Sequence, residues 1–172
     1  MLYLITGPAG VGKSTISNEI ANRSNKSVLL EGDEFYHHVI ASYKPAWVEG
    51  NHLDLFWKEV TNSIKLYLDN DYDVIFNYII GVEDYLKLKE EFKDYDIKFV
   101  VLLVDEKTIV KRDKLRSEEF QMNERSLILL NSFLKKNYPE DNKLFTTDLS
   151  IEESVNEIIN NDKYLIKKTY FK

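Results

Sequence analysis

The chain alternates between short apolar runs and longer segments in which apolar residues recur with the period of an α-helix. The runs are bounded by turn-forming residues, are rich in β-branched and aromatic side chains and do not alternate with polar residues, which is typical of strands buried on both faces. These predicted strands lie at Leu2–Thr6, Val28–Leu30, Val74–Ile80, Ile97–Val104 and Leu144–Thr146. The predicted helices span Lys13–Arg23, Leu53–Leu68, Glu83–Phe92, Lys107–Leu115, Arg125–Leu134 and Ile151–Ile159.

This order of elements predicts an α/β fold, a parallel sheet with helices on both faces, because parallel neighbours are joined by right-handed crossovers. Ser150 and Glu153 have the spacing of a capping box, which marks the start of the last helix. No repeat, low-complexity tract or linker interrupts the pattern, so we expect residues 1–172 to form a single domain. Ligands of such sheets bind at the carboxyl ends of the strands, where the candidate chemistry is therefore to be sought.

The composition excludes several classes of protein. Hydrophobic residues make up 44% and charged residues 30% of the 172 residues, as in soluble globular proteins, and the absence of cysteine excludes thiolate nucleophiles and cysteine-ligated metal sites. A net charge of -6 disfavours nucleic acid as a partner. The longest apolar stretch is far shorter than the roughly 20 residues of a membrane helix, and the N-terminus lacks a cationic signal-peptide start. We expect a cytoplasmic protein, not bound to a membrane, as a monomer or homodimer.

A glycine-rich segment directly after the first predicted strand matches G-x-x-x-x-G-K-[ST], the P-loop. Its glycines let backbone N–H groups wrap a phosphate at the N-terminus of the next helix. Lys13 would bridge the β- and γ-phosphates of ATP, and Ser14 would ligate Mg²⁺. The residues assigned to ATP binding here are Gly7, Pro8, Ala9, Gly10, Val11, Gly12, Lys13, Ser14 and Thr15.

The rest of the chain narrows the class of P-loop protein. Small GTPases read guanine with N-K-x-D, whereas Asn142–Phe145 lacks the aspartate, and no D-x-x-G follows a strand. Further motifs of ABC-type and helicase-type ATPases are also missing. The three histidines lack an accompanying carboxylate cluster, so they do not predict a metal site.

Asp33 lies at the carboxyl edge of the second predicted strand, next to the P-loop. A carboxylate there can orient an acceptor hydroxyl and take its proton as the new P–O bond forms. The alternative is that Asp33 caps a helix starting near Glu34, a common use of aspartate.

Arginines gather in one window of a chain otherwise rich in lysine. Three of its four arginines are Arg112, Arg116 and Arg125, and the planar guanidinium suits bidentate recognition of phosphate. Arg112 and Arg116 share one helical face, and the polar segment at about residues 116–124 fits a lid that excludes water from ATP. The alternative is a solvated helix face paired with neighbouring acids.

The chain resembles the P-loop kinases of small molecules and nucleotides, the group of shikimate kinase, gluconate kinase, chloramphenicol phosphotransferase and the zeta-toxin kinases. The resemblance covers nearly the whole chain. It rests on Gly7–Thr15, on the acidic turn Glu31-Gly32-Asp33, on Arg112-x-x-x-Arg116 followed by Arg125, and on the segment Phe145–Ser150.

The resemblance implies a five-stranded parallel sheet in the order 2-3-1-4-5 in a three-layer P-loop NTPase fold. It also implies that Arg112 lies near the adenine, that Arg116 clamps phosphate, and that the loop containing Thr147 borders the base. The chain lacks the glycine motif that follows strand three in shikimate kinase and the D-R-x-P-W segment of gluconate kinase. Asn77 stands where related kinases often carry an aspartate.

The segment at about residues 34–72 is expected to shape the acceptor pocket, and it is unusually aromatic. We expect Phe56 and Tyr67 to belong to the core. The acceptor-binding candidates are Asp33, Tyr36, Trp47, His52 and Asn77.

The sequence thus predicts an enzyme that transfers the γ-phosphate of ATP to a hydroxyl of a small molecule with Mg²⁺. Lys13, Asp33, Arg116 and Arg125 are the catalytic candidates. Two alternatives stay open. One is a kinase of polynucleotide ends or nucleotide-sugars; the other is an ATP-binding switch or ATPase that acts on a protein partner.

Overall fold

The computed structural model describes residues 1–166, and its centre is a five-stranded parallel sheet in the order β2-β3-β1-β4-β5. The predicted sheet and its strand order are therefore confirmed. Residues of β1 and β4 are all buried, which explains why the strands read as continuous apolar runs. The strands are β1 (Leu2–Thr6), β2 (Ser27–Glu31), β3 (Asp73–Asn77), β4 (Ile97–Leu103) and β5 (Lys143–Phe145).

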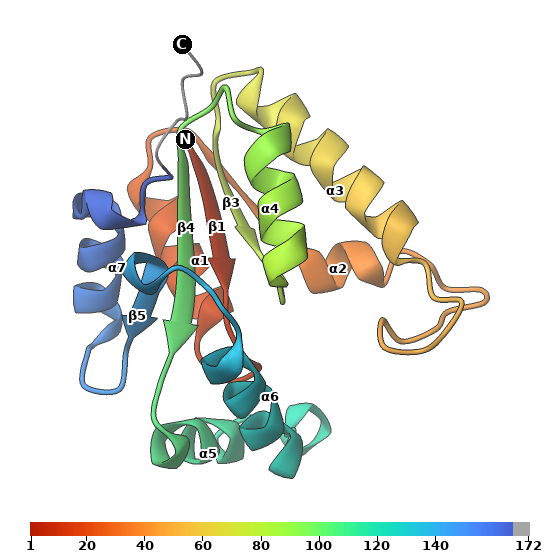
Figure 1. Cartoon of the computed structure of the whole chain (residues 1–172), viewed down its shortest axis with the longest axis vertical. Coiled ribbons are helices and arrows are strands. Elements are labelled where there is room, and N and C mark those ends of the chain that lie inside the picture. The colour runs from red at the N-terminus through yellow and green to blue at the C-terminus, as the bar shows by residue number, and fades with distance from the viewer. Residues whose placement is uncertain (167–172) are drawn as a thin grey trace.

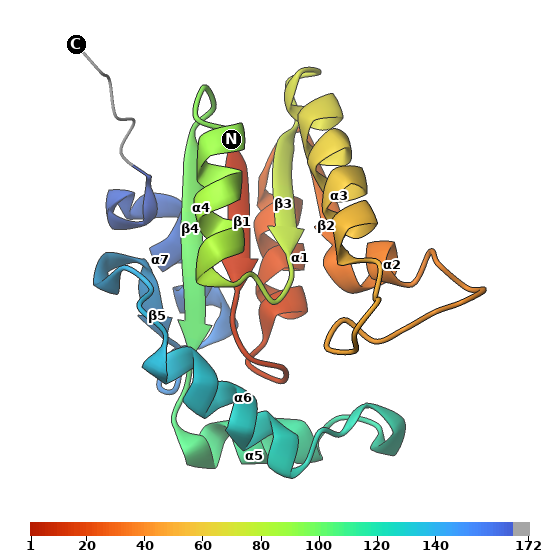
Figure 2. The ribbon, with the colours of Figure 1, turned by 45° about the vertical axis from the view of Figure 1, so that its right-hand side comes forward.

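Helices cover both faces of the sheet (Figure 1). Helices α3 and α4 lie over one face and α1 and α7 over the other, while α5 and α6 lie beyond the carboxyl ends of the strands (Figure 2). The helices are α1 (Lys13–Arg23), α2 (Gly32–Tyr36), α3 (Leu53–Leu68), α4 (Val82–Glu91), α5 (Glu106–Lys114), α6 (Glu124–Lys135) and α7 (Ile151–Asn160).

The third predicted strand was expected to reach Ile80, but β3 ends at Asn77. The hydroxyl of Thr6, at the end of β1, accepts a hydrogen bond from the Ile80 N–H at 2.9 Å and lies 3.4 Å from the Ile80 carbonyl. Because this buried hydroxyl satisfies the backbone of Ile80, the segment turns away from the sheet after Asn77. The prediction of a strand through Ile80 was wrong in its last three residues.

The start of α7 follows the predicted capping box. The Ser150 hydroxyl accepts from the Glu153 N–H at 3.1 Å, and the Glu153 carboxylate accepts from the Ser150 N–H at 2.8 Å. At the other end of α7, the buried Lys98 of β4 donates to the carbonyls of Ile158, Ile159 and Asn161. An ammonium is favoured there because the last carbonyls of a helix lack partners and carry partial negative charge. No helix among residues 1–166 is long and apolar enough to cross a membrane.

Candidate active site

The P-loop lies where the sequence places it, between β1 and α1. Gly7 has φ +147°, and a Cβ there would stand 2.5 Å from the carbonyl oxygen of Leu102 on β4. Gly12, directly before α1, has φ +108°. Both positions require glycine, one for the close approach of β4 and both for the left-handed backbone.

The Lys13 side chain folds back onto this loop. Its ammonium donates to the carbonyls of Gly7 at 3.1 Å and Pro8 at 3.2 Å. Burial lowers the pKa of Lys13 to about 8; the carboxylates of Asp33 and Glu31 oppose this shift, and the guanidinium of Arg116 adds to it. The ammonium is therefore within electrostatic reach of two carboxylates and one arginine.

Ser14 and Glu31 form a polar pair beside that lysine. The Ser14 hydroxyl donates to the Glu31 carboxylate at 3.1 Å, and Glu31 pairs in the sheet register with Asn77. Among the described residues, the Asn77 amide nitrogen and the Ser17 hydroxyl are buried without a hydrogen-bond partner. Asn77 alternates along β3 with Phe76, whose ring packs towards α3, so Asn77 faces the layer of α1.

These groups bear on metal binding. Residues 1–166 hold no cluster of three or more histidine, aspartate, glutamate or cysteine side chains that could hold a metal alone. Mg²⁺ bound with a nucleotide needs less, because it takes one or two protein oxygens plus phosphate oxygens and waters. Ser14 and Glu31 fit that requirement. Glu31 was not among the metal candidates expected from the sequence, although an acid at the end of a strand next to a P-loop is a usable signal.

A cavity of about 340 Å³ adjoins the P-loop, and Arg112 forms part of its wall. The Arg112 guanidinium donates to the carbonyls of Val11 at 2.6 Å and Thr146 at 3.1 Å, so it does not lie on a solvated face paired with acids. Thr147 accepts from the Asp105 N–H at 2.9 Å, which ties the loop that contains Thr147 to the start of α5. The lining residues are Gly10, Val11, Gly12, Thr15, Ile16, Arg112, Thr146, Leu149, Ile151 and Ser154.

The segment predicted as a lid is anchored by one buried carboxylate. Asp113 on α5 is 3% exposed and accepts from the N–H groups of Met122 and Asn123, at 3.0 and 2.7 Å. It also lies 3.6 Å from a guanidinium nitrogen of Arg116, and that nitrogen is buried without a hydrogen-bond partner among the described residues. Arg116 thus sits between the lid and Lys13.

Arg125 occupies a different place from the other two arginines. Its guanidinium lies 4.0 Å from the centroid of the Trp47 ring, in a cation–π contact that joins α6 to the acceptor segment. The structure therefore brings Arg112 and Arg116 to the P-loop and Arg125 to the aromatic loop between α2 and α3.

Asp33 is exposed on the first turn of α2, and its carboxylate makes no hydrogen bond to another described residue. The helix begins two residues earlier than expected, at Gly32, with Glu31 at the N-cap and no side-chain cap bond. The alternative that Asp33 caps the helix was therefore wrong. The ring of Tyr78 packs against the preceding Gly32, where a Cβ would lie 2.5 Å from a Tyr78 ring carbon.

Within the segment expected to bind the acceptor, the loop between α2 and α3 forms turns without regular structure. This loop projects from the body of the molecule (Figure 2). Tyr36 is 3% exposed, stacks on His52 at 4.1 Å, and donates its hydroxyl to the Lys44 carbonyl at 2.8 Å. Trp47 is 69% exposed. Phe56 is buried and Tyr67 packs against the core, as expected.

The fold of the chain is similar to that of several solved kinase structures. A sugar kinase of Janibacter sp. HTCC2649 aligns over 92% of both chains with 15% identity and a TM-score of 0.68. A gluconokinase of Sinorhizobium meliloti aligns over 92% of this chain and 89% of its own, with 16% identity and a TM-score of 0.64. The APS kinase of Mycobacterium tuberculosis, in complex with AMPPNP and APS, aligns over 92% and 95%, with 18% identity and a TM-score of 0.68. The chain has the fold of the P-loop small-molecule kinases. No family model and no curated protein matches it in sequence.

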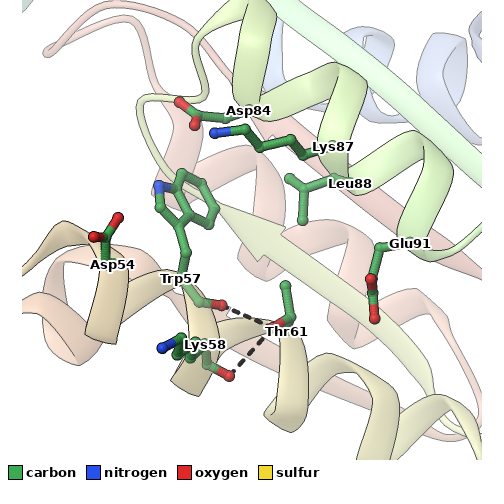
Figure 3. A pocket seen from close by; sticks show the side chains of 8 residues that line it. All are labelled: Asp54, Trp57, Lys58, Thr61, Asp84, Lys87, Leu88 and Glu91. Carbon is green, nitrogen blue, oxygen red and sulfur yellow. Dashed lines mark hydrogen bonds between the residues drawn. The ribbon is translucent and has the colours of Figure 1, made fainter.

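A second cavity of this P-loop kinase fold, about 330 Å³ in volume, lies between α3 and α4 (Figure 3). The indole of Trp57 and the side chain of Leu88 border it, and charged groups of both signs surround them. The Trp57 indole contacts the rings of Phe76 and Tyr78 edge-on. This cavity could not be predicted from the sequence, because its lining residues come from two helices that are separate in the chain and share no local pattern. Its lining residues are Asp54, Trp57, Lys58, Thr61, Asp84, Lys87, Leu88 and Glu91.

Proposed function

We propose that the protein is an ATP- and Mg²⁺-dependent phosphotransferase that moves the γ-phosphate to a hydroxyl group of a small molecule. The observation that carries the proposal is the surroundings of Lys13. Its ammonium closes the P-loop and is within electrostatic reach of Asp33, Glu31 and Arg116. A phosphate cradle, a free carboxylate and a second cation at one point are the parts that phosphoryl transfer to an alcohol needs.

The P-loop would hold the triphosphate through its backbone N–H groups and the N-terminus of α1. Lys13 would exchange the Gly7 and Pro8 carbonyls for phosphate oxygens, which keep the ammonium charged. The cavity beside Arg112 lies on the far side of the P-loop from Asp33 and suits the nucleoside part of ATP.

Ser14 and Glu31 would hold the metal, with Glu31 giving the carboxylate that Asn77 cannot give. The buried nitrogen of the Asn77 amide is a donor, so it would bind an acceptor oxygen of the substrate or of a phosphate. When bound, Mg²⁺ would offset the negative charge of the phosphates.

Asp33 would accept the hydroxyl proton of the acceptor while its oxygen bonds to the γ-phosphorus and ADP leaves. Its exposed carboxylate has no partner among the described residues to compete for that proton. Arg116 would offset charge on the transferring group, and Arg125 would join it when the lid and the aromatic loop close together. Closure would exclude water, which otherwise takes the phosphate.

The test follows the label from γ-labelled ATP in the presence of Mg²⁺ and fractionated small metabolites, nucleosides and 5′-hydroxyl oligonucleotides. The proposal predicts a labelled small organic product from the wild type and a loss of at least about a thousandfold in Lys13→Ala. Label found only as inorganic phosphate would contradict the proposal and favour an ATPase. Label found only on the oligonucleotide would favour a polynucleotide kinase.

A further inference from the structure

Aromatic rings pack beside the first turn of α2, which carries Asp33. The Tyr78 ring packs against Gly32, and Phe56 lies 4.6 Å from the Tyr78 centroid. Tyr36 continues the series at 5.6 Å from Phe56. Burial raises the pKa of the Tyr78 phenol, and Asp33, Tyr36 and Tyr43 raise it further. The Tyr78 phenol therefore lies within electrostatic reach of the Asp33 carboxylate, with Phe56 and Tyr36 next in the series of rings.

The loop that follows α2 presents more flat rings. Tyr43 stacks on His37 at 5.4 Å and meets Tyr36 edge-on at 5.9 Å. Tyr43 remains 40% exposed, and Trp47 remains 69% exposed with Arg125 over one face. Exposed aromatic faces held in place by other rings are the surface on which a flat ligand stacks.

The same segment has little positive charge to offer an anion. Between Gly32 and Leu53 the acids are Asp33, Glu34 and Glu49, and the only lysine or arginine is Lys44. Lys44 donates to the Glu49 carbonyl at 3.2 Å, so it is folded back on its own loop. An anionic acceptor entering here would approach Asp33 and Glu34, and like charges repel. Arg125, which reaches this segment from α6, is held over the Trp47 ring.

We propose that the acceptor is an uncharged alcohol that carries an aromatic ring, with the ring packed on Tyr43 and Trp47 and the hydroxyl directed to Asp33. Nucleosides and aryl alcohols share this chemistry. The inference rests on the proposed function, since it assigns the acceptor of that same reaction. In the step, the alcohol loses its proton to Asp33, its oxygen bonds to the γ-phosphorus, and the bond from phosphorus to ADP breaks.

Two matched series test ring and charge separately. Uridine, ribose and uridine 3′-monophosphate form the first series; benzyl alcohol, ethanol and 3-(hydroxymethyl)benzoate form the second. Gluconate is the ringless anion common to both. Each compound is assayed for labelled product with γ-labelled ATP. We expect kcat/KM for uridine or benzyl alcohol to exceed that of both matched compounds by at least tenfold, and Trp47→Ala to reduce that ratio towards one.

Binding is measured in parallel by fluorescence. Because the chain has two tryptophans, Trp57→Phe leaves Trp47 as the single reporter. Saturable quenching by the ring compounds and none by ribose, ethanol or gluconate is the expected result, with circular dichroism as the check on folding. Preferred phosphorylation of gluconate or of either charged ring compound would overturn the acceptor class while the phosphotransferase stands. Quenching without any labelled product would overturn the proposed function and leave a ring site. Neither product nor quenching from any ring compound would overturn this inference.

Discussion

The Ser14 hydroxyl donates a hydrogen bond to the Glu31 carboxylate across 3.1 Å, although the two residues lie 17 positions apart on different elements. Ser14 belongs to the first turn of α1 and Glu31 ends β2. The contact joins the helix that follows the P-loop to the end of β2, directly before the helical turn that carries Asp33. It also puts a carboxylate where the neighbouring Asn77 offers only an amide.

The first prediction concerns this pair. Glu31→Gln should weaken the binding of Mg²⁺ to the complex of protein and ADP by about tenfold or more. The reason is that the metal loses a charged ligand or a hydrogen-bond partner of its waters. Calorimetry of ADP binding at several Mg²⁺ concentrations measures this without turnover. Glu34→Gln, which removes an exposed acid of the neighbouring helix α2, is the matched control. An unchanged Mg²⁺ dependence in Glu31→Gln would contradict the metal role.

Gly7 and Gly10 separate two causes of strain in the P-loop. Both have positive φ, +147° and +81°, but a Cβ on Gly7 would meet the Leu102 carbonyl at 2.5 Å whereas one on Gly10 would meet nothing closer than 3.8 Å. Gly10→Ala should cost about 1 kcal/mol of folding free energy from backbone strain. Gly7→Ala should cost about 3 kcal/mol or more, since a fixed backbone atom is in the way. Urea unfolding measures both, and equal losses would refute the steric account.

We expect Lys13 to take up protons when a nucleotide binds. In the free protein its pKa is lowered to about 8, so near pH 8.5 a large part of the lysine is neutral. Phosphate oxygens favour the charged form and raise this pKa, so binding takes up protons at pH 8.5 and takes up few at pH 6.5, where the lysine is already charged. Calorimetry of ADP in buffers of different ionisation enthalpy measures the uptake, and Lys13→Met should abolish it. Proton release by the wild type would show that the sign is wrong.

The contacts of Asp113 indicate that it anchors the predicted lid at about residues 116–124. Asp113→Ala leaves the N–H groups of Met122 and Asn123 without their buried acceptor and removes the carboxylate that pairs with Arg116. We expect a loss of about 2 kcal/mol in stability and faster hydrogen exchange at Met122 and Asn123. Glu119→Ala removes the same charge from an exposed position of the lid and should change neither quantity. Unaltered exchange in Asp113→Ala would contradict the anchoring role.

The sequence predicted those parts of the fold whose signals are local. The helices Lys13–Arg23 and Leu53–Leu68 have their expected bounds, because apolar spacing alone identifies them. The end of β3 was missed because it depends on the hydroxyl of Thr6, 74 residues away. Lys98 does not interrupt the apolar strand β4, because its ammonium caps the end of α7. No local sequence pattern contains this contact.

The candidate site divides in the same way. The P-loop is a contiguous motif, so its residues could be named from spacing, and Asp33 from its place after a strand. The pairing of Ser14 with Glu31 and of Arg125 with Trp47 arises only when distant elements meet. The cavity between α3 and α4 could not be predicted for the same reason.

The most direct test of the account is Asp33→Asn, which keeps the size of the side chain and removes the proton acceptor. ATP affinity and transfer to the acceptor are measured on the same preparation. We predict an ATP dissociation constant within about threefold of the wild type and a transfer rate lower by at least about a hundredfold. An equal fall in ATP affinity and transfer, or transfer at the wild-type rate, would contradict the assignment of Asp33 as the base.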